Sequence, residues 1–140
     1  MANALNRLER LPQRFTTAIV RRDALGRPRR FRAVVAEVAG RVVGYASTID
    51  GYNTDRAAPE LFMLDLFVLA RWRGRGIGRA LVITVAREAV RRRLGSVQWG
   101  VRRDNAGARG FYRALGARLG GGTGSALLAG RALAALATAR

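Results

Sequence analysis

The sequence contains no cysteine, no histidine and no lysine among its 140 residues. Without cysteine the chain forms no disulfide and has no thiolate nucleophile. Without histidine it lacks the commonest metal ligand and the commonest general base of enzymes. These absences argue against a metalloenzyme and against a serine-histidine hydrolase, and we expect no metal site.

Long hydrophobic runs are also missing. A membrane span needs roughly 18 consecutive apolar residues, and no stretch of this chain approaches that length. The first residues carry arginines where a signal peptide would have its apolar segment. We therefore expect a cytoplasmic protein with no membrane partner.

Acidic residues are few. The chain has 26 basic residues, all of them arginine, against 9 acidic ones, which gives a formal net charge of +17. Such a field attracts polyanions, among them nucleic acid, an acidic membrane surface and a phosphorylated cofactor. A compositional preference for arginine explains the excess without any partner. The arginines are scattered, and aromatic residues make up only 7%, so we expect no specific nucleic acid, and a basic nucleic-acid-binding module is kept as the rival hypothesis.

The length and the 49% of hydrophobic residues suit a single core, so we predict one domain over residues 1–140. Periodicity and turn residues then predict the elements along the chain. In order, they are a helix over Asn3–Leu11, a helix from Thr16 or Thr17 to Ala24, a hairpin of Phe31–Val38 and Val42–Ile49, a loop over Gly51–Glu60, a strand over Leu61–Ala70, a helix over Ala80–Leu94 ended by Gly95, a strand over Ser96–Val101, a helix capped by Asn105 and ended by Gly116, a strand near Ser125–Gly130, and an alanine-rich tail over Arg131–Arg140.

A glycine-rich turn joins the Leu61–Ala70 strand to the next helix. Glycines at 74, 76 and 78 let the main chain approach a bulky anion, and the positive end of the helix adds to the attraction for phosphate. The P-loop motif fails here because no lysine exists, and the dinucleotide fingerprint fails because Arg79 and Leu81 stand where glycine is needed. A tight connection without a ligand would use the same glycines.

Two blocks carry a resemblance to a known family. Arg73–Gly78, which reads RGRGIG, resembles the R-x-x-G-x-G pyrophosphate motif of the GNAT superfamily of N-acetyltransferases. Downstream, the block from Asn105 to Ala117 is similar to the N-x-x-A-x-x-F-Y-x-x-L-G-A pattern of the same superfamily. The segments LERLP, RFRAVVAEVAGRVVGYA, YNT and LDLFV look most like the diamine (spermidine/spermine-type) acetyltransferase subgroup. The resemblance covers roughly residues 5–118.

The resemblance implies a mixed α/β (α+β) domain with a mostly antiparallel central sheet and helices on both faces. A cleft for acetyl-CoA would open where the Leu61 strand diverges from the Ser96 strand. By matching position, the backbone of three strand residues would pair with the pantetheine arm, the glycine-rich segment would bind the pyrophosphate, and one amide side chain would bond the cofactor's arm. These implied cofactor-binding residues are Leu66, Phe67, Val68, Arg73, Gly74, Arg75, Gly76, Ile77, Gly78, Arg79 and Asn105.

The implied reaction is direct attack of an amine on the thioester carbonyl in a ternary complex, with no covalent enzyme intermediate. Positioning supplies most of the catalysis, so missing cysteine and histidine cost nothing. The resemblance makes Tyr112 the acid that protonates the departing thiolate, although its helix face also suits core packing. Asp65, a carboxylate in an apolar strand, either pairs with an arginine or faces the acceptor amine.

The chain departs from the diamine subgroup at several positions. Leu64 stands where the subgroup has a glutamate, and Arg103 replaces an acidic position with a cation that would repel a polyamine. The acceptor, a small-molecule or peptide amine, is therefore left open, and a degenerate member that binds acetyl-CoA without turnover is an alternative. The superfamily's first strand has no counterpart before Asn3, which suggests an N-terminally shortened chain. Similar proteins commonly pair, so a homodimer fits the resemblance.

Overall fold

The apolar and β-branched segments of the chain form strands, and the amphipathic segments between them form helices. The computed structural model describes residues 1–8, 10, 12–120 and 124–140. Its elements are α1 (Ala2–Leu8), α2 (Thr17–Val20), β1 (Arg32–Val38), β2 (Arg41–Asn53), β3 (Ala58–Val68), α3 (Ile77–Arg91), β4 (Ser96–Gly100), α4 (Ala106–Ala114), β5 (Arg118–Leu119), β6 (Ser125–Ala129) and α5 (Gly130–Thr138). A π-helical turn over Arg21–Leu25 follows α2, and a 3₁₀ turn over Ala70–Trp72 follows β3.

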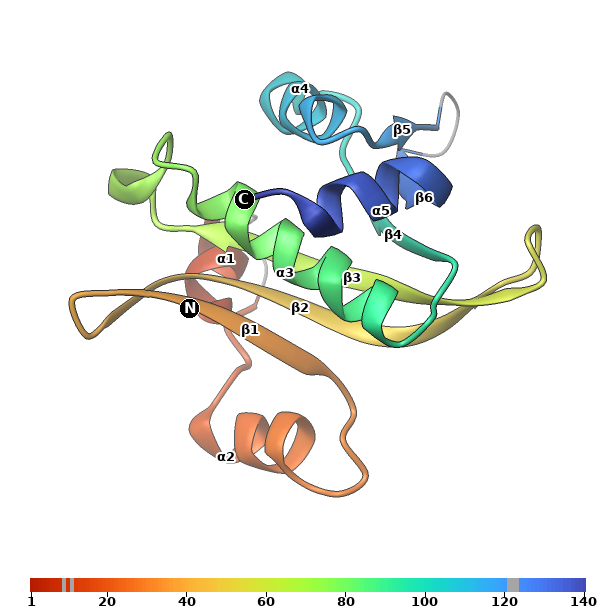
Figure 1. The fold of residues 1–140 in the computed structure, drawn as a ribbon. Helices are drawn as coiled ribbons and strands as arrows, with labels where there is room; N and C mark the ends of the chain where they lie inside the picture. The colour runs from red at the N-terminus through yellow and green to blue at the C-terminus, as the bar shows by residue number, and fades with distance from the viewer. Residues whose placement is uncertain (9, 11, 121–123) are drawn as a thin grey trace.

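The strands form one six-stranded sheet in the order β1-β2-β3-β4-β6-β5 (Figure 1). Among the described strands, β3 and β4 pair in parallel, and every other neighbouring pair is antiparallel. The ladder between β2 and β3 contains a bulge, because Ser47 faces Asp65 while Thr48 faces Met63, which leaves Leu64 without an opposite residue. The expected mixed, mostly antiparallel sheet is confirmed.

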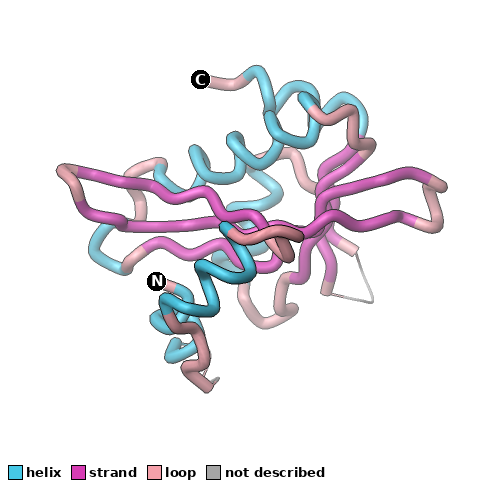
Figure 2. Tube along the Cα trace, turned by 90° about the horizontal axis from the view of Figure 1, so that it is seen from below, coloured by secondary structure: helices cyan, strands magenta, loops and turns pink. Residues whose placement is uncertain are grey.

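Helices cover both faces of the sheet, as expected. The buried face of α3, together with side chains of α4 and α5, packs against β2, β3, β4 and β6 in the main core. On the opposite face, Leu5 of α1 packs with Tyr45 and Phe67 in a smaller cluster. In Figure 2 the two ends of the chain lie on opposite sides of the strand layer. None of the helices in the described ranges combines the length and the apolar character that a membrane crossing requires.

The predicted loop over Gly51–Glu60 is wrong, because most of it lies in a long hairpin. Strand β2 runs on to Asn53 and β3 begins at Ala58, so the turn is short. Glu60 is buried, and its carboxylate accepts hydrogen bonds from Ser96 Oγ at 2.7 Å and Asn53 Nδ2 at 3.0 Å. The hydrogen bonds from Asn53 and Ser96 allow the Glu60 carboxylate to be buried in the sheet. Without knowledge of these partners, the polar residues of this segment look typical of a loop.

The end of α3 also differs from the prediction. The left-handed residue after the helix is Arg93, with φ +57°, and Leu94 N–H donates to the Ala89 carbonyl at 2.9 Å to close the turn. Gly95 therefore does not end the helix. Its N–H donates to the Pro59 carbonyl at 3.1 Å, which holds the turn against the start of β3.

The two ends of the sequence hold further differences. Helix α1 ends at Leu8, short of the predicted Leu11, which lies outside the described residues. Within the described part of the chain no strand precedes β1. The predicted alanine-rich tail forms α5. Leu133 and Leu136 of this helix are buried, and Arg87 of α3 donates to carbonyls of its C-terminal end.

Candidate active site

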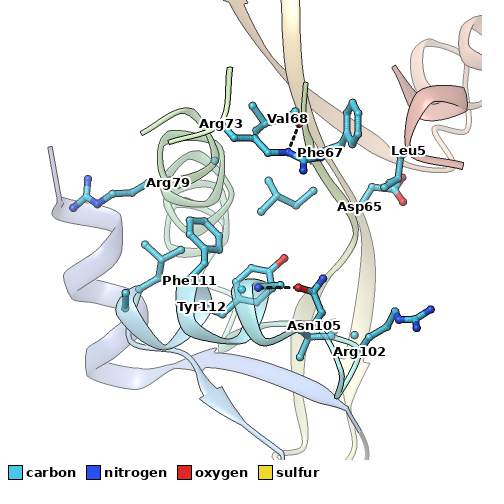
Figure 3. A pocket seen from close by; sticks show the side chains of 18 of the residues that line it. Leu5, Asp65, Phe67, Val68, Arg73, Arg79, Arg102, Asn105, Phe111 and Tyr112 are labelled. Atoms are coloured by element: carbon cyan, nitrogen blue, oxygen red, sulfur yellow. Dashed lines mark hydrogen bonds between the residues drawn. The ribbon is translucent and has the colours of Figure 1, made fainter. Parts of the chain in front are cut away.

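A cleft opens where β3 leaves β4, at the place that the sequence predicts. The parallel ladder between them joins Glu60–Met63 to Ser96–Trp99 and stops there. Beyond Met63, β3 continues beside β2 alone, while the chain after β4 turns away toward α4. The resulting cleft has a volume of about 1360 Å³ and is lined by the end of β3, the glycine-rich loop, the start of α3, the end of β4 and α4 (Figure 3).

The glycine-rich loop presents its main chain to this cleft. Gly74 and Gly76 have φ values of +72° and +78°, which side chains rarely tolerate, and a Cβ at either position would meet nothing within 4 Å. Across the described residues, no acceptor bonds the backbone N–H groups of residues 74–79. Six consecutive free amides at the positive end of α3 form a main-chain site for an anion such as a diphosphate.

The three arginines of this segment are held in different ways. Arg73 lines the cleft, and its Nε donates to the Val68 carbonyl at 2.9 Å. Arg79 also lines the cleft, but its guanidinium donates to the Arg140 carbonyl at 2.6 Å. Arg75 does not line this cleft, because its guanidinium lies 5.0 Å from the centre of the Trp72 ring. The arginine side chains of this segment therefore differ in whether they can reach an anion in the cleft. The main-chain N–H group is the donor that every residue of the segment has in common.

Asn105 lies at the lower edge of the cleft and caps α4, as the sequence predicts. Its Oδ1 accepts a hydrogen bond from Ala108 N–H at 3.0 Å. The other end of the same side chain, Nδ2, has no recorded acceptor within the described ranges. Figure 3 shows this amide nitrogen directed toward the cleft. Asn105 can thus hold its helix and donate to a ligand at the same time.

Tyr112 forms part of the floor of the cleft. Its ring is 8% exposed and packs against Trp99 and Phe111, with ring centres 4.8 and 5.1 Å away. Burial raises the pKa of the phenol from 10.0 to about 12, so the hydroxyl stays protonated near neutral pH. Figure 3 shows this hydroxyl pointing into the cleft. The ring therefore packs in the core while the hydroxyl reaches the cleft, and the role of this hydroxyl as an acid stays a prediction.

Asp65 lines the cleft on the β3 side. One of its carboxylate oxygens, Oδ2, accepts a hydrogen bond from Ser47 Oγ at 2.8 Å. Of the two alternatives for this carboxylate, pairing with an arginine is absent from the described part of the molecule. The side chain is held by the Ser47 hydroxyl, with its carboxylate on the cleft side.

The structure brings together most of the predicted residues and adds others. Leu66, Phe67 and Val68 line the cleft with the glycines, Ile77, Asn105 and Tyr112. Sequence reasoning did not place Leu5 or Phe111 in the site. Leu5 comes from α1, and no local signal indicates that α1 reaches the end of β3. Phe111 packs beside Tyr112 on α4 and lines the cleft from there.

In the described residues, no three or more aspartates and glutamates come together in a way that would hold a metal ion. The donor set of the cleft is instead dominated by N–H groups and arginines, which suits an anionic ligand.

Comparison with known proteins adds a family to this geometry. The model of the acetyltransferase (GNAT) family matches residues 2–117. An L-ornithine N5-acetyltransferase of Arabidopsis thaliana is 31% identical over 78 residues, which is 56% of this chain and 34% of that protein. The match therefore spans about a third of the length of that relative.

Solved structures agree at the level of the fold. A ribosomal-protein-alanine N-acetyltransferase from Brucella melitensis is 29% identical, with a TM-score of 0.56 over 70% of this chain and 65% of that one. A PaiA N-acetyltransferase from Thermoplasma acidophilum, solved in complex with coenzyme A, is 12% identical, with a TM-score of 0.62 over 92% of this chain and 68% of that one.

Proposed function

The chain belongs to the GNAT family of N-acetyltransferases, and we propose that it transfers an acetyl group from acetyl-CoA directly to an amine. The row of amides over residues 74–79 without a recorded acceptor, in which every residue except Arg75 lines the cleft, is the observation that carries this proposal. The expectation of a diamine-type enzyme stays a prediction, as does the homodimer. An ornithine N-acetyltransferase and a ribosomal-protein-alanine N-acetyltransferase among the similar proteins support an amine acceptor on a small molecule or a peptide.

The residues present fit acetyl-CoA. The amides of residues 74–79 suit its diphosphate, and the glycines leave open the space that a Cβ would fill. The backbone of Leu66–Val68 has β2 on one side, and none of the described strands pairs with its other side. Backbone groups on that side, apart from the Val68 carbonyl that Arg73 already bonds, can pair with the amide groups of the pantetheine arm. When bound, acetyl-CoA supplies the activated acetyl carbonyl.

Three side chains of this chain then have separate tasks. The Asn105 amide donates to the cofactor's arm while its oxygen keeps α4 capped. The Tyr112 hydroxyl, held protonated by burial, donates a proton at the floor of the cleft to the departing sulfur. Asp65 receives the acceptor amine, with its carboxylate oriented by Ser47. Holding the two reactants in one cleft supplies most of the rate enhancement.

Binding and turnover test the proposal separately. Isothermal titration of the folded protein with CoA should give saturable binding, and release of free thiol from acetyl-CoA should rise when an amine is added. Binding of CoA with no amine-dependent thiol release across a broad amine panel would favour the alternative of a catalytically degenerate member. Absence of CoA binding by well-folded protein would overturn the proposal.

Substitutions at Asn105 test its double role. In Asn105→Ser, the hydroxyl still caps α4, but the amide donor directed at the cleft is lost. We expect the free energy of unfolding to stay within about 0.5 kcal/mol of the wild type while KM for acetyl-CoA rises ~5-fold.

Asn105→Ala serves as the matched comparison, because it should show the same rise in KM together with about 1 kcal/mol of lost stability. The measurements are urea unfolding and acetyl-CoA saturation curves. An unchanged KM in both variants would remove Asn105 from the cofactor site and leave it as a helix cap.

A further inference from the structure

The cleft is lined by more positive than negative side chains, and the positive side chains fall into two groups. Asp65 is the single acidic side chain among the described lining residues, and four arginines share the lining with it. Arg73 and Arg79 flank the glycine-rich loop, where the diphosphate is proposed to bind. Arg102 and Arg103 follow β4, outside that loop. The second pair of cations therefore needs a different ligand group.

Asp65 lies in β3 and Arg102 follows β4, so the two residues line the cleft from the two strands that diverge there. Phe67 packs with Leu5 on the α1 side, and Asp65, two residues earlier in the extended strand, points the same way. In Figure 3, Asp65 and Arg102 both lie at the side of the cleft away from Arg79.

Space for a ligand group exists between these charges. Gly100 is the last residue of β4, two positions before Arg102, and it lines the cleft. A Cβ at this position would meet nothing within 4 Å. Leu64, which also lines the cleft, is 47% exposed. A small polar group can therefore enter between β3 and the loop after β4 without displacing a side chain.

Both arginines can meet an anion in this space. Arg102 forms a two-pronged ion pair with Asp104, but the two side chains are 74% and 68% exposed, and an ion pair so exposed to water contributes little to stability. The Arg103 guanidinium has no recorded acceptor in the described part of the chain. A carboxylate can accept parallel hydrogen bonds from a guanidinium, which gives it a defined orientation.

We propose that the acceptor carries a carboxylate in the same molecule as its amine, with the ammonium bound at Asp65 and the carboxylate bound by Arg102 and Arg103. The inference rests on the proposed acetyl transfer, and it goes beyond it by stating what the acceptor must carry besides an amine. The same pair of arginines would disfavour a polyamine as the acceptor, because its several positive charges would be repelled by them.

Matched amines test the inference. Ornithine and 1,4-diaminobutane differ only in a carboxylate, and ornithine methyl ester keeps the shape of ornithine while it removes the negative charge. With wild-type protein and saturating acetyl-CoA, we expect kcat/KM for ornithine to exceed that for both of the other amines at least ~10-fold, which is the effect of about one charge-assisted contact. The preference should weaken as salt is raised, because the contact is partly exposed.

Variants assign the preference to the two arginines. Arg103→Gln and Arg102→Gln should each lower the ornithine preference to within about 3-fold of unity and leave KM for acetyl-CoA unchanged. Arg113→Gln is the control, since Arg113 is an exposed arginine of α4 that does not line the cleft, and it should keep the wild-type preference.

The outcomes separate this inference from the proposed function. If the protein binds CoA and acetylates ornithine and 1,4-diaminobutane equally well, acetyl transfer stands and the carboxylate inference is wrong. If Arg103→Gln raises KM for acetyl-CoA and leaves the amine preference intact, the arginine serves acetyl-CoA and the inference is again wrong. Absence of CoA binding would instead overturn the proposed function.

Discussion

Gly76→Asp should lower acetyl-CoA turnover by up to about 100-fold at subsaturating substrate concentrations. Gly76 caps the start of α3 at φ +78°, and a Cβ there projects into open space beside the free amides. A carboxylate at this position would stand close to the proposed diphosphate. At a separation of about 4 Å, two like charges near a protein surface repel by up to ~4 kcal/mol, and with screening in an open cleft we expect a loss of CoA affinity of about 100-fold.

Gly76→Asn is the matched control for this experiment. Asparagine and aspartate have the same shape and tolerate the left-handed conformation to a similar degree. Both can also bond the nearby amides, so the difference between the two variants isolates the charge. The measurements are calorimetric titration with CoA and thermal unfolding of both proteins. Equal CoA affinities for the two variants would show that no anion binds at this helix start.

Tyr112→Phe should lower kcat by about 100-fold and leave KM for acetyl-CoA nearly unchanged, the effect of losing a general acid. The change removes one hydroxyl that has no recorded partner within the described residues and keeps the ring that packs on Trp99 and Phe111. The fold should therefore survive. Steady-state thiol release gives both constants. A variant with full kcat would leave Tyr112 as a core residue only.

The pH dependence gives a second test of the same residue. Because burial raises the Tyr112 pKa to about 12, the acid is protonated at lower pH and activity that depends on it is lost only as the pH rises through that value. An alkaline loss of kcat centred near pH 8 that disappears in Tyr112→Phe would contradict this pKa assignment. Tyr52→Phe is the control, since Tyr52 is 61% exposed on the β2–β3 hairpin and should keep the wild-type profile.

Local signals in the sequence predicted the parts of the fold that local chemistry controls. Asn105 accepts from Ala108 N–H, as a residue that caps a helix should. Gly116 has φ +84° at the end of α4, and the turn at Ala39–Gly40 joins β1 to β2. Each of these outcomes depends on a few neighbouring residues, which the sequence displays directly.

Contacts between distant segments account for the predictions that were wrong. Glu60 reads as a loop residue until Ser96, on another strand, hydrogen-bonds it in the buried sheet. The alanine-rich segment after Arg131 forms a helix because Leu133 and Leu136 are buried in the main core. Arg93 takes the left-handed position that a glycine would ordinarily fill, and no single-residue preference predicts that choice.

The candidate site also has features that follow from local sequence and features that depend on contacts between distant segments. The free amides of the glycine-rich loop follow from its glycines and from the helix that begins there, so a sequence motif suffices to locate them. The direction of side chains does not follow from a motif. Arg75 was predicted to bind the cofactor together with Arg73, yet its guanidinium lies over the Trp72 ring and the residue does not line the cleft. Leu5 joins the lining through packing between α1 and the end of β3.

Leu64, the residue of β3 without a partner in β2, determines which side chains of this strand enter the core and which face the cleft. Met63 points into the main core, and strict alternation from there would carry Asp65 and Phe67 into the same apolar interior. Leu64 inserts one position and reverses the phase, so the carboxylate emerges beside the cleft while Leu66 takes up the core. If Leu64 were instead paired in a regular ladder without the bulge, Asp65 would turn into the apolar core and Leu66 would turn away from it. One inserted position thus lets a single strand serve as a wall of the core at one end and as a wall of the cleft at the other.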